Sequence, residues 1–320
     1  MASILTRRTP PIGAARVPGL HIGWPIRRFV TPHPVRATFG EPRGLVGVAG
    51  AKGLAGAALA EFLQSLNPLS VPGRRIIHHG IDIKAPDGTK IYAVTNGVAK
   101  VGGGTGYGRW VQVGAFRYIH LKNTVAAGTR VRAFRTVLGT VFPGQEHVHL
   151  TRFWRGVPVN PLVFGWPAGY QDHAAPFIAN MFAMRPNGQR VPLDELAGPV
   201  ALIVRAEDVQ SQGGLHGGLY KLGYTIFDGD GHAAIGPYAV LQMDTIPPVA
   251  IGNLMYTVAS TRHRLQPEIF YRLTLKSPSG DGLLRTGRMR PGRYSVQVRA
   301  TDVRGNRTTR NFPIQVHPPN

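Results

Sequence analysis

Short runs of alternating apolar and polar residues, separated by glycine or proline, follow one another along the first half of the chain. This period-two pattern is typical of β-strands that are buried on one face. Asn96-Gly97 between two apolar runs predicts a hairpin turn. We predict strands at residues 35–39, 78–84, 89–94, 98–102, 109–113, 117–121, 129–134, 136–141 and 147–154. No helical periodicity interrupts them, so the pattern predicts an antiparallel β domain with a cleft across one sheet.

A second series of alternating runs occupies the last third of the chain. In the segment 294–300, the side chains of Tyr294, Val296, Val298 and Ala300 fall on one face of a strand. Further strands are predicted at 200–204, 220–227 and 311–316. Seven or so strands within about 120 residues are typical of an immunoglobulin-like β-sandwich. The fold class predicted for the whole protein is therefore all-β.

These patterns divide the chain into four parts. We predict a disordered lead at 1–23, a first β domain at 24–166, a linker at 167–197 and the immunoglobulin-like β-sandwich at 198–320. The first domain carries an insertion at about 44–72, where the sequence is rich in glycine and alanine.

The composition adds a strong positive charge and excludes thiol chemistry. The 320 residues include 37 Lys and Arg against 16 Asp and Glu, giving a net charge of +21, and no cysteine. Disulfides and thiolate metal sites are thus excluded. The charge favours polyanionic partners such as nucleic acid, lipid surfaces or anionic wall polymers. Because the arginines are scattered singly through the strands, we do not expect a specific nucleic-acid module.

The candidate chemistry lies in two short histidine motifs. In an extended strand, His147 and His149 point to the same side and Val148 to the other. If the segment 78–82 is also extended, His78, Gly80 and Asp82 share a face, and the glycine leaves space between the polar groups. Two imidazoles and a carboxylate match the three protein ligands of a catalytic zinc ion, with the fourth position left for water.

The residues around these motifs follow a specific order. The chain reads Arg-Ala-Thr-Phe-Gly-Glu-Pro-Arg (36–43), His-His-Gly-Ile-Asp-Ile (78–83), Ala-Pro-Asp-Gly-Thr-Lys-Ile-Tyr-Ala-Val (85–94), Asn-Gly-Val-Ala-Lys-Val (96–101), Gly-Tyr-Gly-Arg-Trp-Val (106–111), Tyr-Ile-His-Leu (118–121), His-Val-His-Leu (147–150) and Val-Pro-Val-Asn-Pro-Leu-Val-Phe-Gly (157–165). Over roughly 24–166 this series resembles the lysostaphin/LytM-type zinc metallopeptidases, which cleave peptide cross-links and stems of bacterial peptidoglycan. The ending Ala-Thr-Asp-x-x-Gly-Asn resembles β-sandwich appendages of some secreted metallopeptidases.

The resemblance implies one Zn²⁺ per chain, bound by His78, Asp82 and His149. It gives His120 and His147 the catalytic roles. A neutral imidazole can take the proton from the attacking water, and a protonated one can stabilise the oxyanion or protonate the leaving amine. The sequence has no His-Glu-x-x-His motif to supply a glutamate base. Which of the two histidines is the base stays open.

Two segments depart from the family pattern. Residues 114–117 replace a longer hairpin, and Phe-Pro-Gly-Gln-Glu (142–146) replaces a glycine-rich approach to His147. Both changes reshape the expected walls of the substrate groove. Tyr107 and Trp110 could line that groove, although aromatic residues in strands are more often part of the core. The motif Asp-Gly-Asp-Gly (228–231) is interpreted as a hairpin turn, because the further acidic ligands of a calcium loop are missing.

A peptidoglycan substrate implies an extracytoplasmic location: the periplasm, the cell wall or the secreted fraction. Residues 1–20 contain no continuous apolar run and give no clear signal peptide. Residues 44–63 are too weakly apolar for a transmembrane helix.

Two alternatives to a peptidase are kept. One is a catalytically weak or inactive wall-binding or scaffold protein that uses the same groove. The other is polyanion binding through charge alone, which predicts affinity that falls steeply with salt and ignores zinc.

Overall fold

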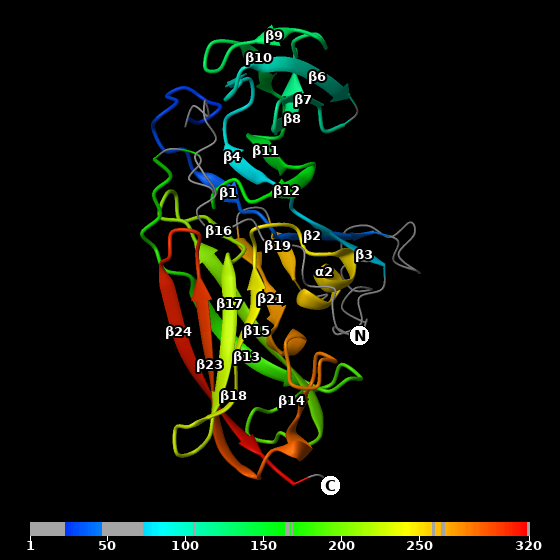
Figure 1. Ribbon diagram of the computed structural model, residues 1–320, viewed down its shortest axis with the longest axis vertical. Coiled ribbons are helices and arrows are strands. Elements are labelled where there is room, and N and C mark those ends of the chain that lie inside the picture. Colours follow the sequence, from blue (N-terminus) through cyan, green and yellow to red (C-terminus); the bar gives the residue numbers. More distant parts are fainter. Residues whose placement is uncertain are drawn as a thin grey trace. The chain divides into compact units, whose positions relative to one another are not determined.

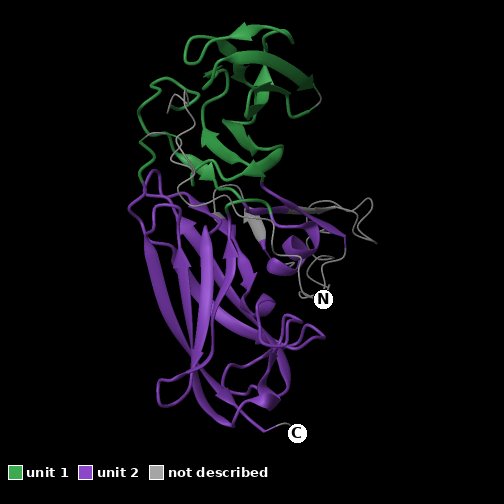
Figure 2. Cartoon of the chain, in the orientation of Figure 1, with its two compact units in different colours: residues 1–39, 79–171, 244–246 green, residues 40–78, 172–243, 247–320 purple. Residues whose placement is uncertain are grey.

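The predicted strands form two separate structural units in the computed structural model (Figure 2). The structure describes residues 23–46, 73–104, 106–163, 167, 169–257, 260–263 and 266–318. Unit 1 comprises residues 1–39, 79–171 and 244–246, and unit 2 comprises 40–78, 172–243 and 247–320. The predicted lead, apart from its last residue, and the predicted insertion from residue 47 onwards lie outside the described residues.

Nearly all regular structure in the described residues is antiparallel β-strand, which confirms the all-β prediction (Figure 1). Helical structure there is limited to α2 (Val249–Met255) and the 3₁₀ turns η1 (Leu273–Leu275) and η2 (Thr286–Arg288). No helix in the described part of the chain has the length and apolar character needed to cross a membrane.

Unit 1 is built on one antiparallel sheet in which the order β1-β4-β11-β8-β7-β6-β9 is extended by β5, β10 and β12. Its strands are β1 (Val35–Ala37), β4 (Ile81–Lys84), β5 (Lys90–Tyr92), β6 (Gly97–Gly103), β7 (Arg109–Val113), β8 (Phe116–Lys122), β9 (Arg130–Val131), β10 (Val137–Val141), β11 (His147–Trp154) and β12 (Val157–Val159). Each overlaps a strand expected from the alternation, except β12. The alternation succeeds here because the sheet buries side chains such as Ile83, Val111 and Val148 completely.

The predicted strand at 78–84 is regular only from Ile81 onwards. Both backbone groups of His78 are bonded elsewhere: its carbonyl accepts from the amide of Gly40 at 2.8 Å, and its amide donates to the carbonyl of Glu41 at 2.9 Å. The preceding strand β3 (Arg74–Ile77) pairs with β2 (Pro42–Val46). The chain therefore leaves one ladder at His78 and joins another at Ile81.

Strand β11 lies between β4 and β8, and its register aligns the histidine motif with its partners. His149 faces Asp82 on β4 and Ile119 on β8 as a Cα pair. A slip of one residue would turn every side chain of β11 to the opposite face of the sheet. This register fixes the position of His149 opposite Asp82.

Unit 2 contains a four-stranded sheet, β18-β17-β23-β24, and a sheet of six strands with β15 at its centre. Besides β2 and β3, its strands are β13 (Phe177–Met184), β14 (Arg190–Val191), β15 (Pro199–Val209), β16 (His216–Gly217), β17 (Lys221–Phe227), β18 (Ala233–Gln242), β19 (Thr261–His263), β20 (Gln266–Glu268), β21 (Phe270–Arg272), β22 (Leu284–Arg285), β23 (Gly292–Thr301) and β24 (Arg307–Val316). Val296, Val298 and Ala300 of β23 are fully buried. Two antiparallel sheets agree with an all-β unit, and the immunoglobulin-like topology stays a prediction.

The structure differs from the expected linker at 167–197. Within that interval, β13 pairs antiparallel with β15, and β14 pairs with β13. A register irregularity between Ile178 and Asn180 interrupts the alternation of β13, which is why no clear periodicity is visible in its sequence.

The residues between β17 and β18 form the hairpin turn predicted for Asp-Gly-Asp-Gly. The Asp228 carboxylate accepts hydrogen bonds from the backbone amides of Asp230 at 3.1 Å and His232 at 2.8 Å. This carboxylate stabilises the turn, as aspartates commonly do.

Candidate metal centre

Three of the predicted site residues lie together. His78, Asp82 and His149 each offer one ligand atom, and these atoms all lie within 4.8 Å of one another. All three side chains are buried, with exposed fractions of 5%, 2% and 6%. Asp82 and His149 are held by the pairing of β4 with β11, and His78 precedes Asp82 by four residues. Buried polar groups in such numbers require bonding partners, and a divalent cation is one.

The two ring nitrogens of His149 have different partners. Nδ1 lies 3.0 Å from Oδ1 of Asp82, and Nε2 lies 2.9 Å from the hydroxyl oxygen of Thr151. In the tautomer that donates from Nε2 to Thr151, Nδ1 directs its lone pair towards the carboxylate. A cation bound between these two electron-rich atoms would stabilise them in this tautomer, whereas in the other tautomer Nδ1–H donates to Asp82 directly. The donor set therefore fits a metal ion with Nδ1 of His149 as a ligand.

Sequence reasoning missed Thr151. Its side chain is buried, 2% exposed, and lies two residues beyond His149 on the same face of β11. The period-two rule that relates His147 to His149 extends to this position. The hydroxyl of Thr151 could therefore have been identified from the sequence as a group that orients the ring of His149.

His147 is buried beside the cluster. Its Nδ1–H donates to the carbonyl of Gln145, and its Nε2 lies 3.6 Å from Oδ1 of Asp82. Burial lowers the pKa of His147 to about 4, although the Asp82 carboxylate and the Gln145 carbonyl oppose that shift. Since a carbonyl can only accept, the neutral ring carries its proton on Nδ1 and its lone pair on Nε2. In this arrangement His147 is a neutral base at pH 7.

His120 approaches the same region from β8. Its ring centroid lies 4.6 Å from that of His147, and its Nδ1–H donates to the carbonyl of Tyr107 at 2.9 Å. Burial lowers the pKa of His120 as well. Its backbone has φ +67°, in the left-handed region that residues other than glycine seldom adopt. Such strain is often found at functional sites, where the surrounding structure maintains it.

The segment 142–146, which departs from the family pattern, is fixed by two charged side chains. Asp87 accepts hydrogen bonds from the amides of Gly144 at 2.6 Å and Glu146 at 3.0 Å, and these bonds lower its pKa. Arg36 donates from Nη1 to the carbonyl of Gln145 at 3.1 Å. That carbonyl also accepts from His147, so this loop positions the histidine ring. Arg36 and Asp87 both belong to the sequence motifs, but their spacing did not indicate that they hold this loop.

Gly80 lets the backbone approach the candidate metal site closely. A Cβ atom at this position would lie 2.4 Å from the carbonyl oxygen of Leu150 and 2.6 Å from Nε2 of His149. Both distances are far below van der Waals contact. The sequence suggested that Gly80 leaves space between polar groups. In the structure, Leu150 and His149 of β11 occupy that space.

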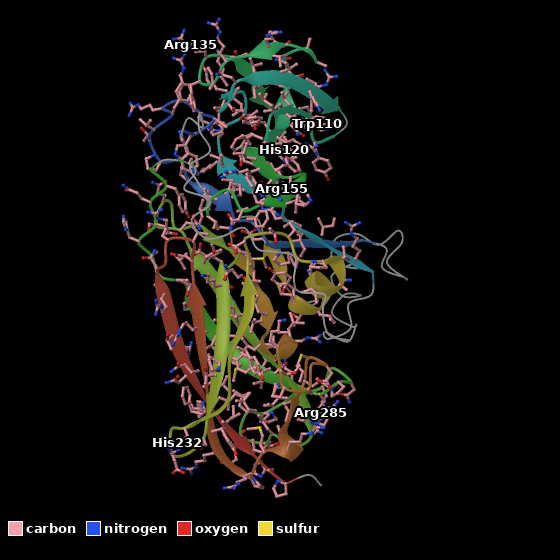
Figure 3. The ribbon with its side chains drawn as sticks, in the orientation of Figure 1. Trp110, His120, Arg135, Arg155, His232 and Arg285 are labelled. Carbon is pink, nitrogen blue, oxygen red and sulfur yellow. The ribbon has the colours of Figure 1, made fainter. Side chains whose placement is uncertain are left out.

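Tyr107 and Trp110, the two aromatic residues that could line the groove, differ in exposure. Figure 3 labels Trp110 together with His120. Tyr107 is 72% exposed, so the core interpretation is wrong for it, and its ring centroid lies 6.4 Å from that of His120. Trp110 is half-buried, with the guanidinium of Arg117 stacked 4.7 Å from its ring. The neighbouring hairpin is short, because only Gly114 and Ala115 separate β7 from β8.

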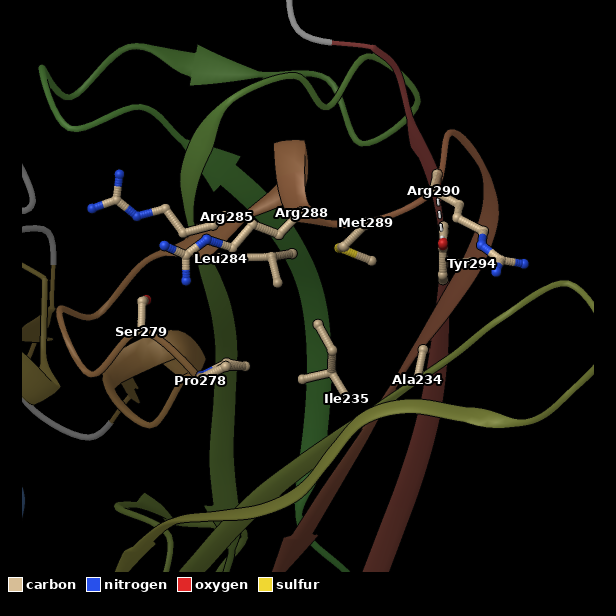
Figure 4. Close-up of a pocket in the computed structure, with 10 residues that line it drawn as sticks. All are labelled: Ala234, Ile235, Pro278, Ser279, Leu284, Arg285, Arg288, Met289, Arg290 and Tyr294. Carbon is tan, nitrogen blue, oxygen red and sulfur yellow. Dashed lines mark hydrogen bonds between the residues drawn. The ribbon is translucent and has the colours of Figure 1, made fainter.

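Unit 2 contains a cavity of about 340 Å³ (Figure 4). Arg285, Arg288 and Arg290 contribute cationic side chains to its lining, and Leu284 and Tyr294 add apolar surface. The other lining residues are Ala234, Ile235, Pro278, Ser279 and Met289. Guanidinium groups above apolar surface favour anionic organic ligands.

Comparison with known proteins identifies one domain. Residues 76–161 match the family model of Peptidase family M23, the LytM/lysostaphin-type family. The resemblance inferred from the motifs is confirmed over this range, which contains His78, Asp82, His120, His147 and His149. No curated protein matches the chain. The match supports a peptidase with a peptide substrate.

Proposed function

We propose that the domain of Peptidase family M23 at residues 76–161 is a zinc-dependent endopeptidase that hydrolyses peptide bonds in bacterial peptidoglycan. The observation that carries this proposal is the buried cluster of His78, Asp82 and His149, with the neutral imidazole of His147 beside it. This is a set of metal ligands combined with a proton acceptor, which metal-assisted hydrolysis requires.

The metal ligands in this proposal are His78, Asp82 and Nδ1 of His149. Two imidazole nitrogens and one carboxylate form a donor set that suits zinc better than calcium or magnesium, which prefer oxygen. Zinc bound there would polarise the scissile carbonyl and lower the pKa of a coordinated water to about 7. Thr151 orients His149 by accepting a hydrogen bond from its Nε2–H.

His147 is proposed as the general base. Its Nε2 lies 3.6 Å from a ligand oxygen of Asp82, and burial keeps the ring unprotonated at pH 7. It takes the proton of the attacking water and then passes it to the amine that leaves. The ring centroid of His120 lies 6.3 Å from that of His149. We propose that His120, once its ring is protonated, binds the oxygen of the scissile carbonyl.

The proposed substrate rests on the family resemblance and on charge. The net charge of +21 favours a polyanionic wall, and exposed Tyr107 beside His120 offers an aromatic surface for a peptide. The arginine-lined cavity of unit 2 supports anionic wall polymers as additional partners. Peptidoglycan lies outside the cytoplasm, so the proposed location is extracytoplasmic.

One observation favours the alternative of a catalytically weak wall-binding protein. The two-residue turn at Gly114-Ala115 shortens a hairpin that would otherwise form part of the groove wall. A lower wall would reduce the binding energy available for positioning the peptide. Against this alternative, the ligand set and both histidines are intact.

Purified peptidoglycan provides the test. An endopeptidase releases new amino groups without new reducing sugar ends, and chelation should abolish that release until zinc is restored. If the zinc-loaded protein co-sediments with the wall but releases no amino groups from it, the result would instead support a wall-binding protein. Binding that disappears at high salt and is unaffected by zinc would point to charge alone.

A further inference from the structure

Unit 2 contains a second cluster of acidic side chains, well separated in sequence from the histidine motifs. Asp172, Asp208 and Asp302 each offer a carboxylate oxygen, and the three oxygens lie within 4.8 Å of one another. All three side chains are 2% exposed or less. Asp208 belongs to β15, Asp302 directly follows β23, and Asp172 precedes β13. The cluster thus joins three segments of unit 2.

Two of these carboxylates are fixed by surrounding donors. Oδ1 of Asp172 accepts from the amide and the hydroxyl of Ser211, at 3.0 and 2.6 Å, and from the amide of Ala174 at 3.1 Å. Asp302 accepts from the amides of Arg304 and Asn306 at 2.7 and 2.9 Å, and from the side-chain amide of Asn306 at 2.7 Å. Burial raises the pKa of Asp302, and the hydrogen bonds from Asn306 and Arg304 oppose that shift.

Asp208 differs from its neighbours. Its Oδ2 accepts from the side-chain amide of Gln210 at 2.8 Å. Its Oδ1 is fully buried and has no hydrogen-bond partner within the described part of the chain. A buried carboxylate oxygen without a partner is strongly unfavourable, since it has lost its hydration and gained nothing. This orphaned oxygen is a separate indication that a positively charged ligand belongs in the cluster.

The charges around Asp208 also favour a bound cation. No lysine or arginine in the described ranges forms an ion pair with Asp208 or Asp302, although the chain as a whole carries 37 such residues. Buried Glu41 adds a further negative charge near Asp208. Burial, followed by the charges of Asp172, Asp302 and Glu41, raises the pKa of Asp208 well above its usual value. Carboxylates so arranged need either a shared proton or a cation.

We propose that Asp172, Asp208 and Asp302 bind a calcium ion that links these three segments of unit 2. The donors are all oxygen, which favours a hard cation such as calcium over zinc. Calcium binds oxygen at about 2.3–2.6 Å, so two oxygens on one ion can lie as far as about 5 Å apart, which accommodates the observed separation. Water completes the coordination. The role is structural, and it is independent of the peptidase proposal.

The test uses the full chain freed of metal by dialysis against a chelator. Calcium titration should give about one binding site per chain, and about 1 mM Ca²⁺ should raise the melting temperature by about 5 °C or more. Asp208→Asn should abolish both effects. Asp228→Asn should retain both, because it alters the exposed acidic turn between β17 and β18 instead.

Asparagine resembles a protonated aspartate in shape and charge, so Asp208→Asn also tests the shared proton. If calcium neither binds nor stabilises the wild-type chain, and Asp208→Asn melts at the same or a higher temperature, the cluster holds a proton and the calcium proposal is wrong. If Asp208→Asn fails to fold, the wild-type titration decides alone. Calcium stabilisation that persists in folded Asp208→Asn would also overturn the assignment.

Discussion

Nδ1 of His149 lies 3.0 Å from Oδ1 of Asp82, across the paired strands β11 and β4. The two residues are 67 positions apart in the sequence, and the strand register makes them direct neighbours. The distance agrees with two ligands of a single zinc ion, because ligand atoms about 2.1 Å from the metal in tetrahedral geometry are separated by about 3.4 Å.

Thr151→Val should weaken zinc binding about 10- to 100-fold, because valine cannot accept a hydrogen bond from His149 Nε2–H and the ring loses its orientation. The shapes of threonine and valine are similar, so the fold should be retained. A competition titration with a zinc-binding dye measures the effect. Thr151→Ser, which keeps the hydroxyl, should recover most of the affinity. Equal zinc affinity for the valine variant and the wild type would contradict the assigned role.

Gly80→Ala should reduce both stability and zinc retention. The added methyl group would lie 2.4 Å from the Leu150 carbonyl oxygen, so β11 must shift by several tenths of an ångström, at a cost of about 1–3 kcal/mol. Gly287→Ala is the control, because no atom lies within 4 Å of the place its Cβ would take and its backbone φ is not positive. Urea unfolding compares the two variants. Equal unfolding free energies would show that the close approach at Gly80 is unimportant.

His120→Asn should distinguish the contribution of His120 to catalysis from the effect of its left-handed backbone on stability. Asparagine tolerates the left-handed backbone at φ +67° better than alanine, so His120→Asn should be more stable than His120→Ala by about 1 kcal/mol. Both should lose about 10²- to 10⁴-fold in kcat, because neither can present a protonated imidazole to the substrate carbonyl. Zinc content should be unchanged in both. A fully active His120→Asn would remove His120 from the proposed chemistry.

Asp87→Asn should lower stability at neutral pH and reduce activity through the loop that positions His147. The bonds from Gly144 and Glu146 depress the pKa of Asp87, so their stabilising effect is present above its unfolded value of about 4 and is lost as the pH falls through the folded pKa. The difference in urea midpoint between wild type and variant should therefore be largest at pH 7 and shrink below about pH 4. A difference that stays constant with pH would exclude this electrostatic explanation.

The alternation of the sequence predicted the sheet of unit 1 because strands such as β7 bury alternate side chains, here Val111 and Val113. It also predicted that His147 and His149 point the same way, since a strand has no other arrangement of these side chains. It failed at β13, where a register irregularity at Ile178 breaks the pattern, and it overextended the strand at His78, whose backbone groups are bonded to residues 40 and 41. Such long-range pairings leave no mark on local periodicity.

The site was predictable as a set of residue types but not as a network. The proximity of His78, Asp82 and His149, the proposed metal ligands, was expected from the ordered motifs. The carbonyls that fix the histidine tautomers belong to Gln145 and Tyr107, and every residue has a carbonyl, so composition cannot single them out. The cluster of Asp172, Asp208 and Asp302 likewise comes from three distant segments. Only the folded chain brings its members together.

The most direct test of the peptidase proposal measures zinc content and peptidoglycan hydrolysis in wild type, His149→Ala and Val148→Ala. The wild type should retain about one zinc per chain and hydrolyse the wall. His149→Ala should lose both properties because it removes one of the three proposed metal ligands. Val148→Ala should keep both while losing about 1–3 kcal/mol of stability, since Val148 is fully buried. Full hydrolysis by His149→Ala, or hydrolysis by wild type stripped of zinc, would contradict the account.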